Sequence, residues 1–506
     1  MDIMKLQNGS DVRGIALEGV EGEHVNLTED VSLKIGFAFV QWLSKKTGKA
    51  CDELKIGAGR DSRLTGPSLV NALICGFVSA GAKVVNCNLA TTPAMFMSIV
   101  FNQTKYDGSA MVTASHLPFN RNGIKFFDAD GGLEHDDITE ILKIASEVND
   151  DFVQNAKKNF STEVESFNLL DIYAEHLKNK IKEGISSEQE KPLSGLHIVV
   201  DSGNGASGFF VDKILKPLGA DTTGSQFLEP DGKFPNHIPN PENKEAMEAI
   251  RSAVLKNKAD LGLIFDTDVD RMSAVLSDGS EINRDSIIAM ISAILAPEYP
   301  GSTIITDSVT SDRLTYFLED VLGLKHLCYM RGYKNVINKQ KELNAKGIVS
   351  PLAMETSGHG ALKDNYFLDD GAFLAVKLVI ALAKAAKEGK KLDSLIEKLP
   401  PLVEEGEYRF KINCEDFKAY GNKVLEEFKK RAVAKGYQMP QSYEGIRLSF
   451  KTDEVQGWIL LRMSLHDPVM PMNIEGGRKG DLEKLVNIAR ELTDGFDKLD
   501  RSSLTR

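Results

Sequence analysis

A serine that could act as a nucleophile stands in the segment TASHLPFNRNGIKFF, residues 113–127. The segment follows an apolar run and is rich in turn-forming residues, so we expect Ser115 in an exposed turn at a strand end. A serine hydroxyl needs activation, and Lys125, on the strand that returns from the turn, is a candidate proton carrier. Taken alone, such a segment is more often a plain surface turn. It lacks the GxSxG pattern, so a Ser/His/Asp esterase is not indicated.

Three carboxylates directly follow another apolar run, in ADLGLIFDTDVDR, where they are Asp266, Asp268 and Asp270. We expect this segment to be extended, so that residues i, i+2 and i+4 point to one face and the carboxylates converge. A buried acidic cluster needs a cation, and oxygen ligands favour Mg²⁺ or another hard divalent ion. An EF-hand loop fits poorly, because Arg271 and Ser277 occupy its glycine and glutamate positions. A solvated acidic turn is the simpler alternative.

A glycine pattern supports a rival class of protein. In HIVVDSGNGASG, the glycines at 203, 205 and 208 match GxGxxG between an apolar run and the helix-like FFVDKIL, residues 209–215. This pattern is typical of NAD-dependent oxidoreductases, with Asp221 as a fair candidate for the ribose-binding acid. A tight turn without a ligand is equally compatible with it. No GxxxxGK[ST] loop is present, which disfavours a P-loop nucleotidase.

Two further polar segments could bind a substrate. METSGHG places Glu355, Ser357 and His359 after an apolar run, and several hydrogen-bonding groups in one loop suit a polyol. RMSLHDP, residues 462–468, contains an arginine, a serine and a histidine that could form a small anion site, since arginine offers bidentate donors to phosphate.

The elements that must position these residues alternate between strands and helices. Such alternation favours α/β layers, and three cycles of it suggest three related units. Strands are expected at 54–59, 82–88, 109–115, 196–201, 259–266, 302–307 and 348–355, and helices at 66–80 and 287–295.

The last hundred residues differ from the rest, because strand-like YRFKIN, GIRLSF and GWILLRMSL stand between helices expected to begin near Cys414 and Lys479. This pattern predicts a separate α+β domain. With breaks at 150–166, 283–285 and KLPP at 398–401, we predict four domains, at residues 1–165, 166–284, 285–400 and 401–506.

Composition narrows the class of protein. The 506 residues are enough for three or four domains, and 42% hydrophobic with 26% charged residues is typical of a soluble globular chain. The net charge is -12, and no long basic run offsets it. We therefore do not expect a protein whose affinity comes from neutralising the phosphates of a nucleic acid. The five scattered cysteines show no zinc spacing, and no signal peptide or long apolar stretch is evident, so we expect a cytoplasmic protein without a membrane segment.

Taken together and in order, these segments resemble the α-D-phosphohexomutases, the superfamily of phosphoglucomutase, phosphomannomutase and phosphoglucosamine mutase. TASHLPFNRNGIKFF is similar to the phosphoserine loop, FDTDVDR to the metal loop, ETSGH to the sugar-binding loop and RMSLHDP to the phosphate loop. NGSDVRG, GRDSR, TTP, PDGKFPNHIPNPE and RGYK are further similarities, so the resemblance spans almost the whole chain.

The resemblance implies an α/β protein with four domains around one cleft, three of them related mixed-sheet domains, and a Mg²⁺-dependent enzyme. Phosphate would move between the 1 and 6 positions of glucose or mannose phosphate through phosphorylated Ser115 and a hexose 1,6-bisphosphate. It further implies roles for matched residues: catalysis by Ser115, Arg13, Lys125 and Arg271; metal binding by Ser115, Asp266, Asp268 and Asp270; substrate binding by His116, Lys334, Glu355, Ser357, His359, Arg462, Ser464 and His466.

The phosphate loop departs from the family pattern, because Met463, Leu465, His466 and Asp467 replace its usual residues. This difference keeps open a phosphotransferase that releases the bisphosphate as its product. A sugar-phosphate-binding regulator without turnover and the NAD-dependent oxidoreductase are less favoured alternatives. The partners expected are small sugar phosphates, with neither nucleic acid nor membrane, and the chain is expected to be a monomer or a small homo-oligomer.

Overall fold

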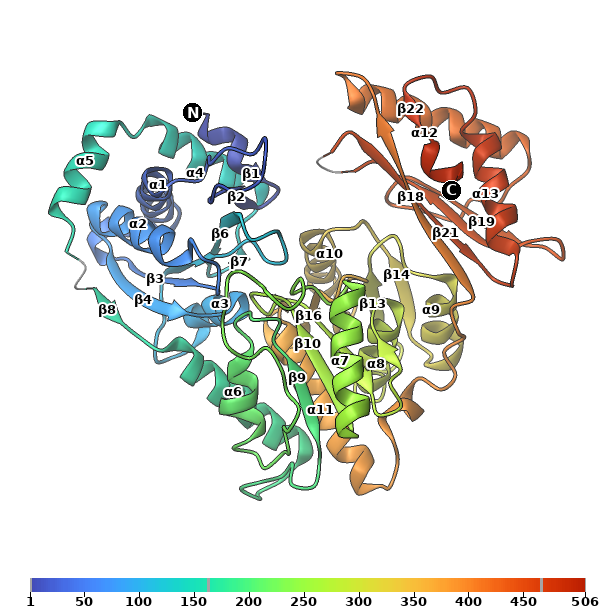
Figure 1. Cartoon of the computed structure of the whole chain (residues 1–506), viewed down its shortest axis with the longest axis horizontal. Helices are drawn as coiled ribbons and strands as arrows, with labels where there is room; N and C mark the ends of the chain where they lie inside the picture. The colour runs from blue at the N-terminus through green and yellow to red at the C-terminus, as the bar shows by residue number, and fades with distance from the viewer. Residues whose placement is uncertain (1, 162–163, 465–466, 506) are drawn as a thin grey trace. The chain divides into compact units, whose positions relative to one another are not determined.

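The structure, a computed structural model, describes residues 2–161, 164–464 and 467–505. Its contacts divide the chain into two units, whose helices and strands are labelled in Figure 1. The first consists of residues 1–283, 357–360 and 368–393, and the second of residues 284–356, 361–367 and 394–506.

The first sheet has the strand order β1-β2-β6-β5-β3-β4-β8, with β7 paired to β6. Strand β5 is parallel to β3 and antiparallel to β6, so the turn at 113–120 joins two neighbouring strands, and Lys125 lies on the returning strand as expected. The strands are β1 Gln7–Asn8, β2 Asp11–Ile15, β3 Lys55–Arg60, β4 Lys83–Leu89, β5 Gly108–Val112, β6 Arg121–Asp128, β7 Gly131–Gly132 and β8 Glu165–Ser166.

Helices cover this sheet, and glycines let two of them approach closely. A Cβ atom at Gly36 would lie 2.4 Å from the Leu73 carbonyl oxygen, and one at Gly76 would lie 2.2 Å from that of Leu33. The Phe39 ring stacks on Phe126 of β6 at 4.4 Å and links helix to sheet. The helices are α1 Glu29–Thr47, α2 Gly66–Ser79, α3 Thr92–Val100, α4 His135–Glu147 and α5 Asp150–Asn159, with short turns η1 Ile3–Leu6 and η2 Cys51–Glu53.

The second sheet has the order β12-β11-β10-β9. Strand β10 is parallel to β9 and antiparallel to β11, so residues 266–271 form the turn of a hairpin. Its elements are β9 Ile198–Asp201, η3 Phe210–Leu215, α7 Lys244–Asn257, β10 Leu261–Phe265, β11 Met272–Leu276 and β12 Glu281–Ile282. The helix expected at 209–215 is present as the π-helical turn η3.

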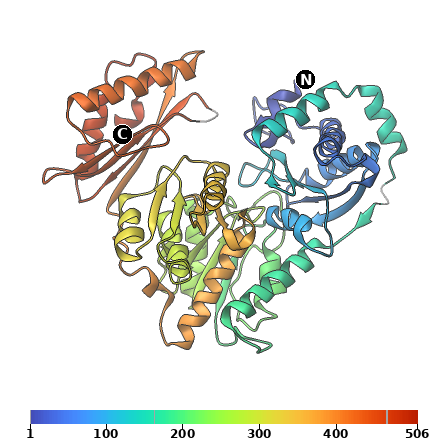
Figure 2. The ribbon, with the colours of Figure 1, turned by 180° about the vertical axis from the view of Figure 1, so that it is seen from behind.

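Two helices distant in sequence pack together in the first unit. Helix α6, Leu169–Ile185, lies beside α11, Gly371–Lys387 (Figure 2). The Tyr173 hydroxyl donates a hydrogen bond of 2.6 Å to Asp370, which caps α11. The chain after residue 367 therefore completes a unit that begins at the N-terminus.

The third sheet has the order β14-β13-β15-β16-β17, with β13 parallel to both β14 and β15. Its strands are β13 Thr303–Thr306, β14 Lys325–Cys328, β15 Leu352–Met354, β16 Gly360–Leu362 and β17 Leu368–Asp369. The helices are α8 Asp285–Leu295, α9 Asp312–Tyr316, η4 Phe317–Val321, α10 Tyr333–Ala345, η5 Lys363–Asn365 and η6 Leu392–Leu395.

The C-terminal sheet has the order β19-β20-β21-β18-β22. Phe410, Ile459 and Met472 belong to its buried core, against which Phe428 of α12 packs. The elements are β18 Glu404–Ile412, α12 Phe417–Ala434, β19 Ile446–Lys451, β20 Gln456–Leu461, β21 Val469–Gly476, α13 Asp481–Leu492, β22 Leu499–Asp500 and η7 Ser502–Thr505.

The predicted fold class is confirmed: three α/β domains with mixed sheets precede a C-terminal domain of strands and helices. The strands expected from the apolar runs are all present, within a few residues of their predicted bounds. Among the described residues, no helix combines the length and apolar character that crossing a membrane requires.

Candidate active site

Ser115 lies in the turn between β5 and β6 with a backbone φ of 49°, a left-handed conformation that few serines adopt. Its side chain is buried, so the expectation of an exposed serine was wrong. Its Oγ donates a hydrogen bond of 2.8 Å to Asp266 Oδ2. Its own amide donates to Thr113 Oγ1. The strained backbone is thus held by specific contacts, as is common at functional sites.

Arg63 supports the turn that carries Ser115 through hydrogen bonds to its backbone. Its guanidinium donates to four backbone carbonyls, those of Pro118, Arg121, Leu117 and Ser115. Only 1% of this arginine is exposed. Burial lowers its pKa, and the neighbouring Asp61 carboxylate opposes that effect. Arg63 thereby supplies hydrogen-bond donors to the backbone carbonyls of this tight turn.

The three aspartates converge, although not in the way expected from the sequence. Residues 266–271 form a tight turn rather than an extended segment, and Val269 within it has a φ of 69°. Asp266, Asp268 and Asp270 are each fully buried, and one carboxylate oxygen from each lies within 4.8 Å of the others. The prediction of strand alternation was therefore wrong, because the turn itself brings the three carboxylates together.

The charges in this cluster are unequal. Burial and the two neighbouring carboxylates raise the pKa of Asp266 well above its ordinary value. Burial also acts to raise the pKa of Asp270, but the Lys125, His359 and Arg271 charges outweigh it and lower that pKa. Lys125 Nζ lies 2.5 Å from Asp270 Oδ2 and 3.6 Å from Asp268 Oδ2.

These carboxylates fit a divalent cation. The buried Oδ1 atoms of Asp268 and Asp270 have no hydrogen-bond partner among the described residues. Asp268 is held by Thr92, whose Oγ1 donates to its Oδ2 at 2.5 Å. Oriented, buried carboxylate oxygens with spare acceptor capacity are what a hard divalent ion requires.

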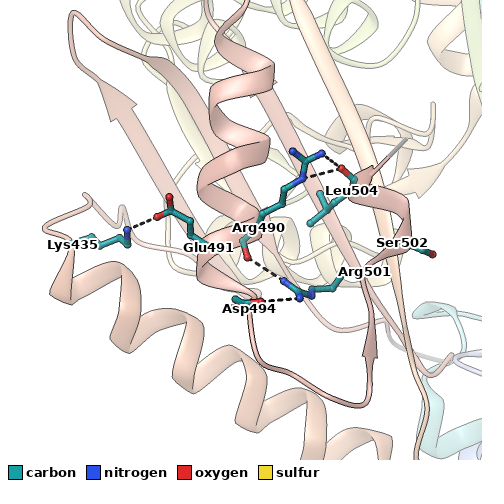
Figure 3. A pocket seen from close by; sticks show the side chains of 7 residues that line it. All are labelled: Lys435, Arg490, Glu491, Asp494, Arg501, Ser502 and Leu504. Carbon is teal, nitrogen blue, oxygen red and sulfur yellow. Dashed lines mark hydrogen bonds and ion pairs between the residues drawn. The ribbon is translucent and has the colours of Figure 1, made fainter.

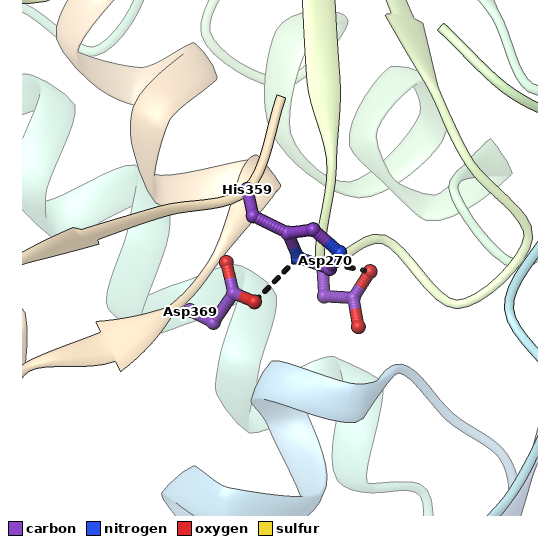
Figure 4. A group of neighbouring side chains, drawn as sticks. All are labelled: Asp270, His359 and Asp369. Carbon is purple, nitrogen blue, oxygen red and sulfur yellow. Dashed lines mark ion pairs between the residues drawn. The ribbon is translucent and has the colours of Figure 1, made fainter. Parts of the chain in front are cut away.

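His359 lies between Asp369 and Arg271. Its Nδ1 lies 2.5 Å from Asp369 Oδ2 (Figure 4). Its Nε2 accepts a hydrogen bond of 2.8 Å from Arg271 Nε. Since Nε2 is an acceptor, the ring proton must be on Nδ1 and point at Asp369. Burial acts to lower the pKa of His359, but Asp369 outweighs it and the pKa is raised.

Asp270, His359 and Asp369 also lie close enough to hold a metal ion together. The 2.5 Å between His359 Nδ1 and Asp369 Oδ2 is shorter than two ligand atoms about 2.0–2.1 Å from one cation would allow, so this contact is an ion pair between the two side chains. We therefore assign these residues to the orientation of Arg271.

The remaining predicted residues of the first unit lie around the same serine. Arg13, on β2, donates to the Thr113 carbonyl at 2.8 Å and pairs with Asp11. His116 Nδ1 lies 3.4 Å from Ser115 Oγ, and the charge of Arg271, followed by burial, lowers the pKa of His116 well below its ordinary value. Ser357 is buried, and its Oγ has no hydrogen-bond partner among the described residues.

The second unit brings together another set of predicted residues. Glu355, 4% exposed, accepts a hydrogen bond of 2.6 Å from the Gly332 amide. Arg462 is buried and lies 3.5 Å from Glu444. The amide of Arg331, the residue before Gly332, donates to the same Glu444. The loop at 331–332 therefore contacts both Glu355 of the sugar-binding loop and Glu444, which lies beside Arg462 of the phosphate loop.

Lys334 is the second residue of α10 and is partly buried. Ser464 precedes β21, and its Oγ accepts from the Asp467 amide at 3.3 Å. Met463 is partly buried and packs against Gly421 of α12 and the core of the C-terminal domain. His466, predicted to bind substrate, lies outside the described residues.

The glycines at 203–208 let this segment pack closely against the turn that carries the three aspartates. A Cβ atom at Gly205 would lie 2.8 Å from the Thr267 backbone, and the Ala206 amide donates to the Thr267 carbonyl at 2.9 Å. One at Gly208 would lie 2.6 Å from the Leu228 carbonyl oxygen. These glycines allow the chain to pack on itself, which removes the main argument for a dinucleotide site.

A hollow of about 790 Å³ in the C-terminal domain contains three cationic side chains (Figure 3). Arg490 donates to the Leu504 carbonyl, Arg501 to Asp494, and Lys435 pairs with Glu491. Each of these cations therefore already has an acceptor within the C-terminal domain.

Arg63, Thr92 and Asp369 were given no role from the sequence. The first two lie in GRDSR and TTP, whose similarity to the family was the available signal. Asp369 lies in the polar stretch that follows His359, and its contact with His359 is what identifies it.

Comparison with known proteins places the chain in a family. The models of phosphoglucomutase/phosphomannomutase α/β/α domains I, II and III match residues 4–151, 171–279 and 283–403. A phosphoglucomutase/phosphomannomutase of Thermococcus kodakarensis is 31% identical over 92% of this chain and 93% of that protein. A phosphomannomutase/phosphoglucomutase of Pseudomonas putida is 29% identical over 89% of this chain and 90% of that protein.

The fold agrees with this match. The crystal structure of a phosphoglucomutase/phosphomannomutase family protein from Burkholderia thailandensis superimposes with a TM-score of 0.76 at 26% identity, and covers 97% of this chain and 98% of that one. The serine, the aspartate turn and the histidine loop described above all lie within the matched ranges. The chain therefore belongs to the phosphoglucomutase/phosphomannomutase family.

Proposed function

We propose that the protein is a Mg²⁺-dependent phosphohexomutase that moves phosphate between the 1 and 6 positions of glucose or mannose phosphate. Phosphorylated Ser115 would donate its phosphate, and a hexose 1,6-bisphosphate would be the intermediate. The observation that carries this proposal is the 2.8 Å contact between Ser115 Oγ and Asp266 within a cluster of three buried carboxylates. The relatives' names support the substrate class.

Asp266, Asp268 and Asp270 would hold the metal ion together with a phosphate oxygen on Ser115. A bound Mg²⁺ would neutralise negative charge on the phosphoserine and on the transferring group. A phosphoserine adds up to about two negative charges beside three aspartates, so the cluster needs such a cation.

In the transfer, a substrate hydroxyl oxygen bonds to phosphorus while the bond from phosphorus to Ser115 Oγ breaks. The hydroxyl proton must leave, and the released Oγ must gain a proton. Lys125 and Arg13 lie beside the aspartate cluster and the serine turn, respectively, where they would assist these proton movements. In the second transfer, the Ser115 hydroxyl oxygen bonds to the phosphorus at the other end of the bisphosphate while the bond from that phosphorus to the sugar oxygen breaks, which restores the phosphoserine.

Arg271 would orient the phosphoserine, since its Nε lies 3.9 Å from the Asp266 oxygen that accepts from Ser115. Its direction depends on His359, which in turn is fixed by Asp369. His116 and Ser357 would contact the substrate in this unit.

In the second unit, Glu355 would accept hydrogen bonds from sugar hydroxyls. Arg462, Ser464, Lys334 and His466 would hold the remote phosphate. The arginine suits this role because its planar fork binds phosphate oxygens in pairs.

The proposal is tested by incubating purified protein with glucose 1-phosphate, Mg²⁺ and a trace of glucose 1,6-bisphosphate, followed by phosphorus NMR. We expect catalytic conversion to glucose 6-phosphate, loss of it with chelator, and its absence in Ser115→Ala. Mass spectrometry should find about 80 Da on the peptide containing Ser115. Ser146→Ala, which changes an exposed serine of α4, is the matched control.

Two results would contradict the proposed cycle. Accumulation of bisphosphate in a fixed ratio to consumed phosphate donor would indicate release instead of retention of the intermediate. Full activity in Ser115→Ala would remove the serine from the mechanism.

A further inference from the structure

In the second unit, Glu444 forms an ion pair with Arg462, the arginine to which the proposed function assigns the remote phosphate. One of its carboxylate oxygens, Oε2, accepts hydrogen bonds from the Ser308 hydroxyl at 2.6 Å and from the Arg331 amide at 2.9 Å. The other, Oε1, lies 3.5 Å from Arg462 Nη1. A single carboxylate thus joins the loop after β13, the loop before α10 and the loop after β20.

The backbone holds this carboxylate against Arg462. Gly445 has a φ of 63°, and a Cβ atom there would lie 2.2 Å from the Leu461 carbonyl oxygen and 2.8 Å from Arg462 Cβ. The glycine therefore lets the turn lie directly on the Arg462 backbone. The Ser442 hydroxyl closes the turn by donating to the Glu444 carbonyl at 2.7 Å.

Arg462 has donors to spare in this arrangement. Its side chain is 9% exposed, and its Nε has no hydrogen-bond partner among the described residues. Burial lowers the pKa of Arg462, and the Glu444 charge partly compensates. The 3.5 Å ion pair leaves the planar fork of this arginine incompletely matched, whereas a phosphate could bind it through two oxygens.

We propose that the Glu444 carboxylate is a built-in competitor of the substrate's phosphate for Arg462, and so sets the affinity of the phosphate site. The inference rests on the proposed function, in which Arg462 binds the remote phosphate. Glu444 lies against Nη1, so a phosphate that takes Nη1 as one of its two donors must displace Glu444. The observed affinity is then reduced by the fraction of molecules in which Glu444 holds the arginine.

A competitor of this kind suits an enzyme that must release and rebind its intermediate at one site. By lowering the affinity of the site for phosphate, Glu444 allows the bisphosphate to turn around. While the site is empty, Glu444 also screens the buried Arg462 charge. The same carboxylate, bonded to Ser308 and Arg331, holds the loops of the third and fourth sheets together between substrate molecules.

The experiment measures binding of inorganic phosphate to the full chain by isothermal titration calorimetry, which needs no turnover. Glu444→Gln keeps an oxygen acceptor for Ser308 and Arg331 but removes the charge that attracts Arg462. We expect its dissociation constant for phosphate to be about fivefold to tenfold lower than that of the wild type. In the mutase assay, its KM should fall in the same proportion.

Two further variants make the outcome decisive. Arg462→Ala should abolish phosphate binding, which locates the measured site. Glu483→Gln removes a charge from an exposed position on α13 and should bind phosphate like the wild type. This control separates the specific contact from the general effect of one fewer negative charge.

Unchanged or weaker phosphate binding by Glu444→Gln would overturn the inference, because Glu444 would then orient Arg462 rather than compete for it. Binding that persists in Arg462→Ala, or no binding by any variant, would overturn it as well. If Glu444→Gln binds phosphate more tightly but no variant interconverts hexose phosphates, the competitor stands and the proposed mutase function fails.

Discussion

At the scale of single residues, two positioning side chains support the candidate site. Arg63 donates to four carbonyls of the serine turn, and Asp369 fixes the histidine that bonds Arg271. Neither is hydrogen-bonded, among the described residues, to the carboxylates that would hold a metal, yet each decides where a reactive group points.

We expect Arg63→Ala to lose about 3 kcal/mol of unfolding free energy, because it leaves several buried carbonyls and the Asp61 carboxylate without their partner. Activity should fall as well, since the turn at Ser115 loses its support. Denaturant unfolding and phosphorylation of Ser115, followed by mass spectrometry, measure the two effects. Arg60→Ala, which removes a neighbouring arginine that donates only to the Asp61 carbonyl, should cost less.

For Asp369→Asn, we expect kcat to fall about tenfold to a hundredfold, because the amide can present a donor to His359 Nδ1 and favour the wrong tautomer. Nitrogen NMR of the His359 ring should show the proton shifting from Nδ1 to Nε2. A fall in kcat without any tautomer change would contradict the positioning role.

At the scale of elements, close helix packing and a half-buried carboxylate make separate contributions to stability. Helices α1 and α2 touch at glycines, where backbone lies against backbone. Glu475 of β21 accepts a hydrogen bond of 2.5 Å from Ser311, the residue that caps α9.

Gly76→Ala should destabilise the protein by about 2 kcal/mol despite the better helix propensity of alanine, since its Cβ would meet backbone atoms that cannot rotate away. Gly184→Ala in α6 meets only the Ile380 side chain, so we expect a smaller loss there. The denaturant midpoints of the two variants measure their losses of stability. Equal losses would contradict the distinction between backbone and side-chain contacts.

Glu475 makes stability depend on pH. Burial raises its pKa to about 7, with Asp285 and Asp312 acting in the same direction and Arg313 and Ser311 opposing them. Because the folded state holds the proton more tightly than the unfolded chain, this group's contribution is lost as pH rises from about 4.5 through 7.

Glu475→Gln should therefore be less sensitive to pH than the wild type in this range. Thermal unfolding at pH 5 and pH 8.5 measures the difference, and the variant should gain most, relative to the wild type, at pH 8.5. An equal shift in melting temperature at both pH values would contradict the assignment.

At the scale of the whole molecule, the order of the chain does not follow the order of its units. Helix α11 packs on α6 although about two hundred residues separate them, and His359 reaches Arg271 from the same late part of the chain. The first unit is therefore incomplete until the chain has passed residue 387.

We expect a fragment ending at residue 283 to expose the apolar face of α6 and to aggregate or lack fixed tertiary packing. Addition of residues 284–400 should restore that packing, because this segment contains α11 and Asp370. Near-ultraviolet circular dichroism of the two fragments tests this. A stably packed fragment 1–283 would show that α11 is dispensable.

Much of the fold was predictable from local pattern. The apolar runs at 196–201 and 259–266 became β9 and β10, because continuous apolar segments of that length bury in mixed α/β sheets. Ser115 and the three aspartates were likewise identified, since their types and spacing at strand ends are unusual. The four domain boundaries, the assigned substrate contacts and the identity of the metal ion stay predictions.

What the sequence by itself determined was which residues have chemical potential and which segments form strands and helices, because both depend on residue type and short-range periodicity. Only the tertiary structure decided that a tight turn, rather than an extended strand, gathers the aspartates, and that Arg63, Asp369 and Glu444 contact the serine turn, His359 and Arg462, respectively. Those contacts join residues far apart in the chain, and their geometry is set by packing that no local pattern records.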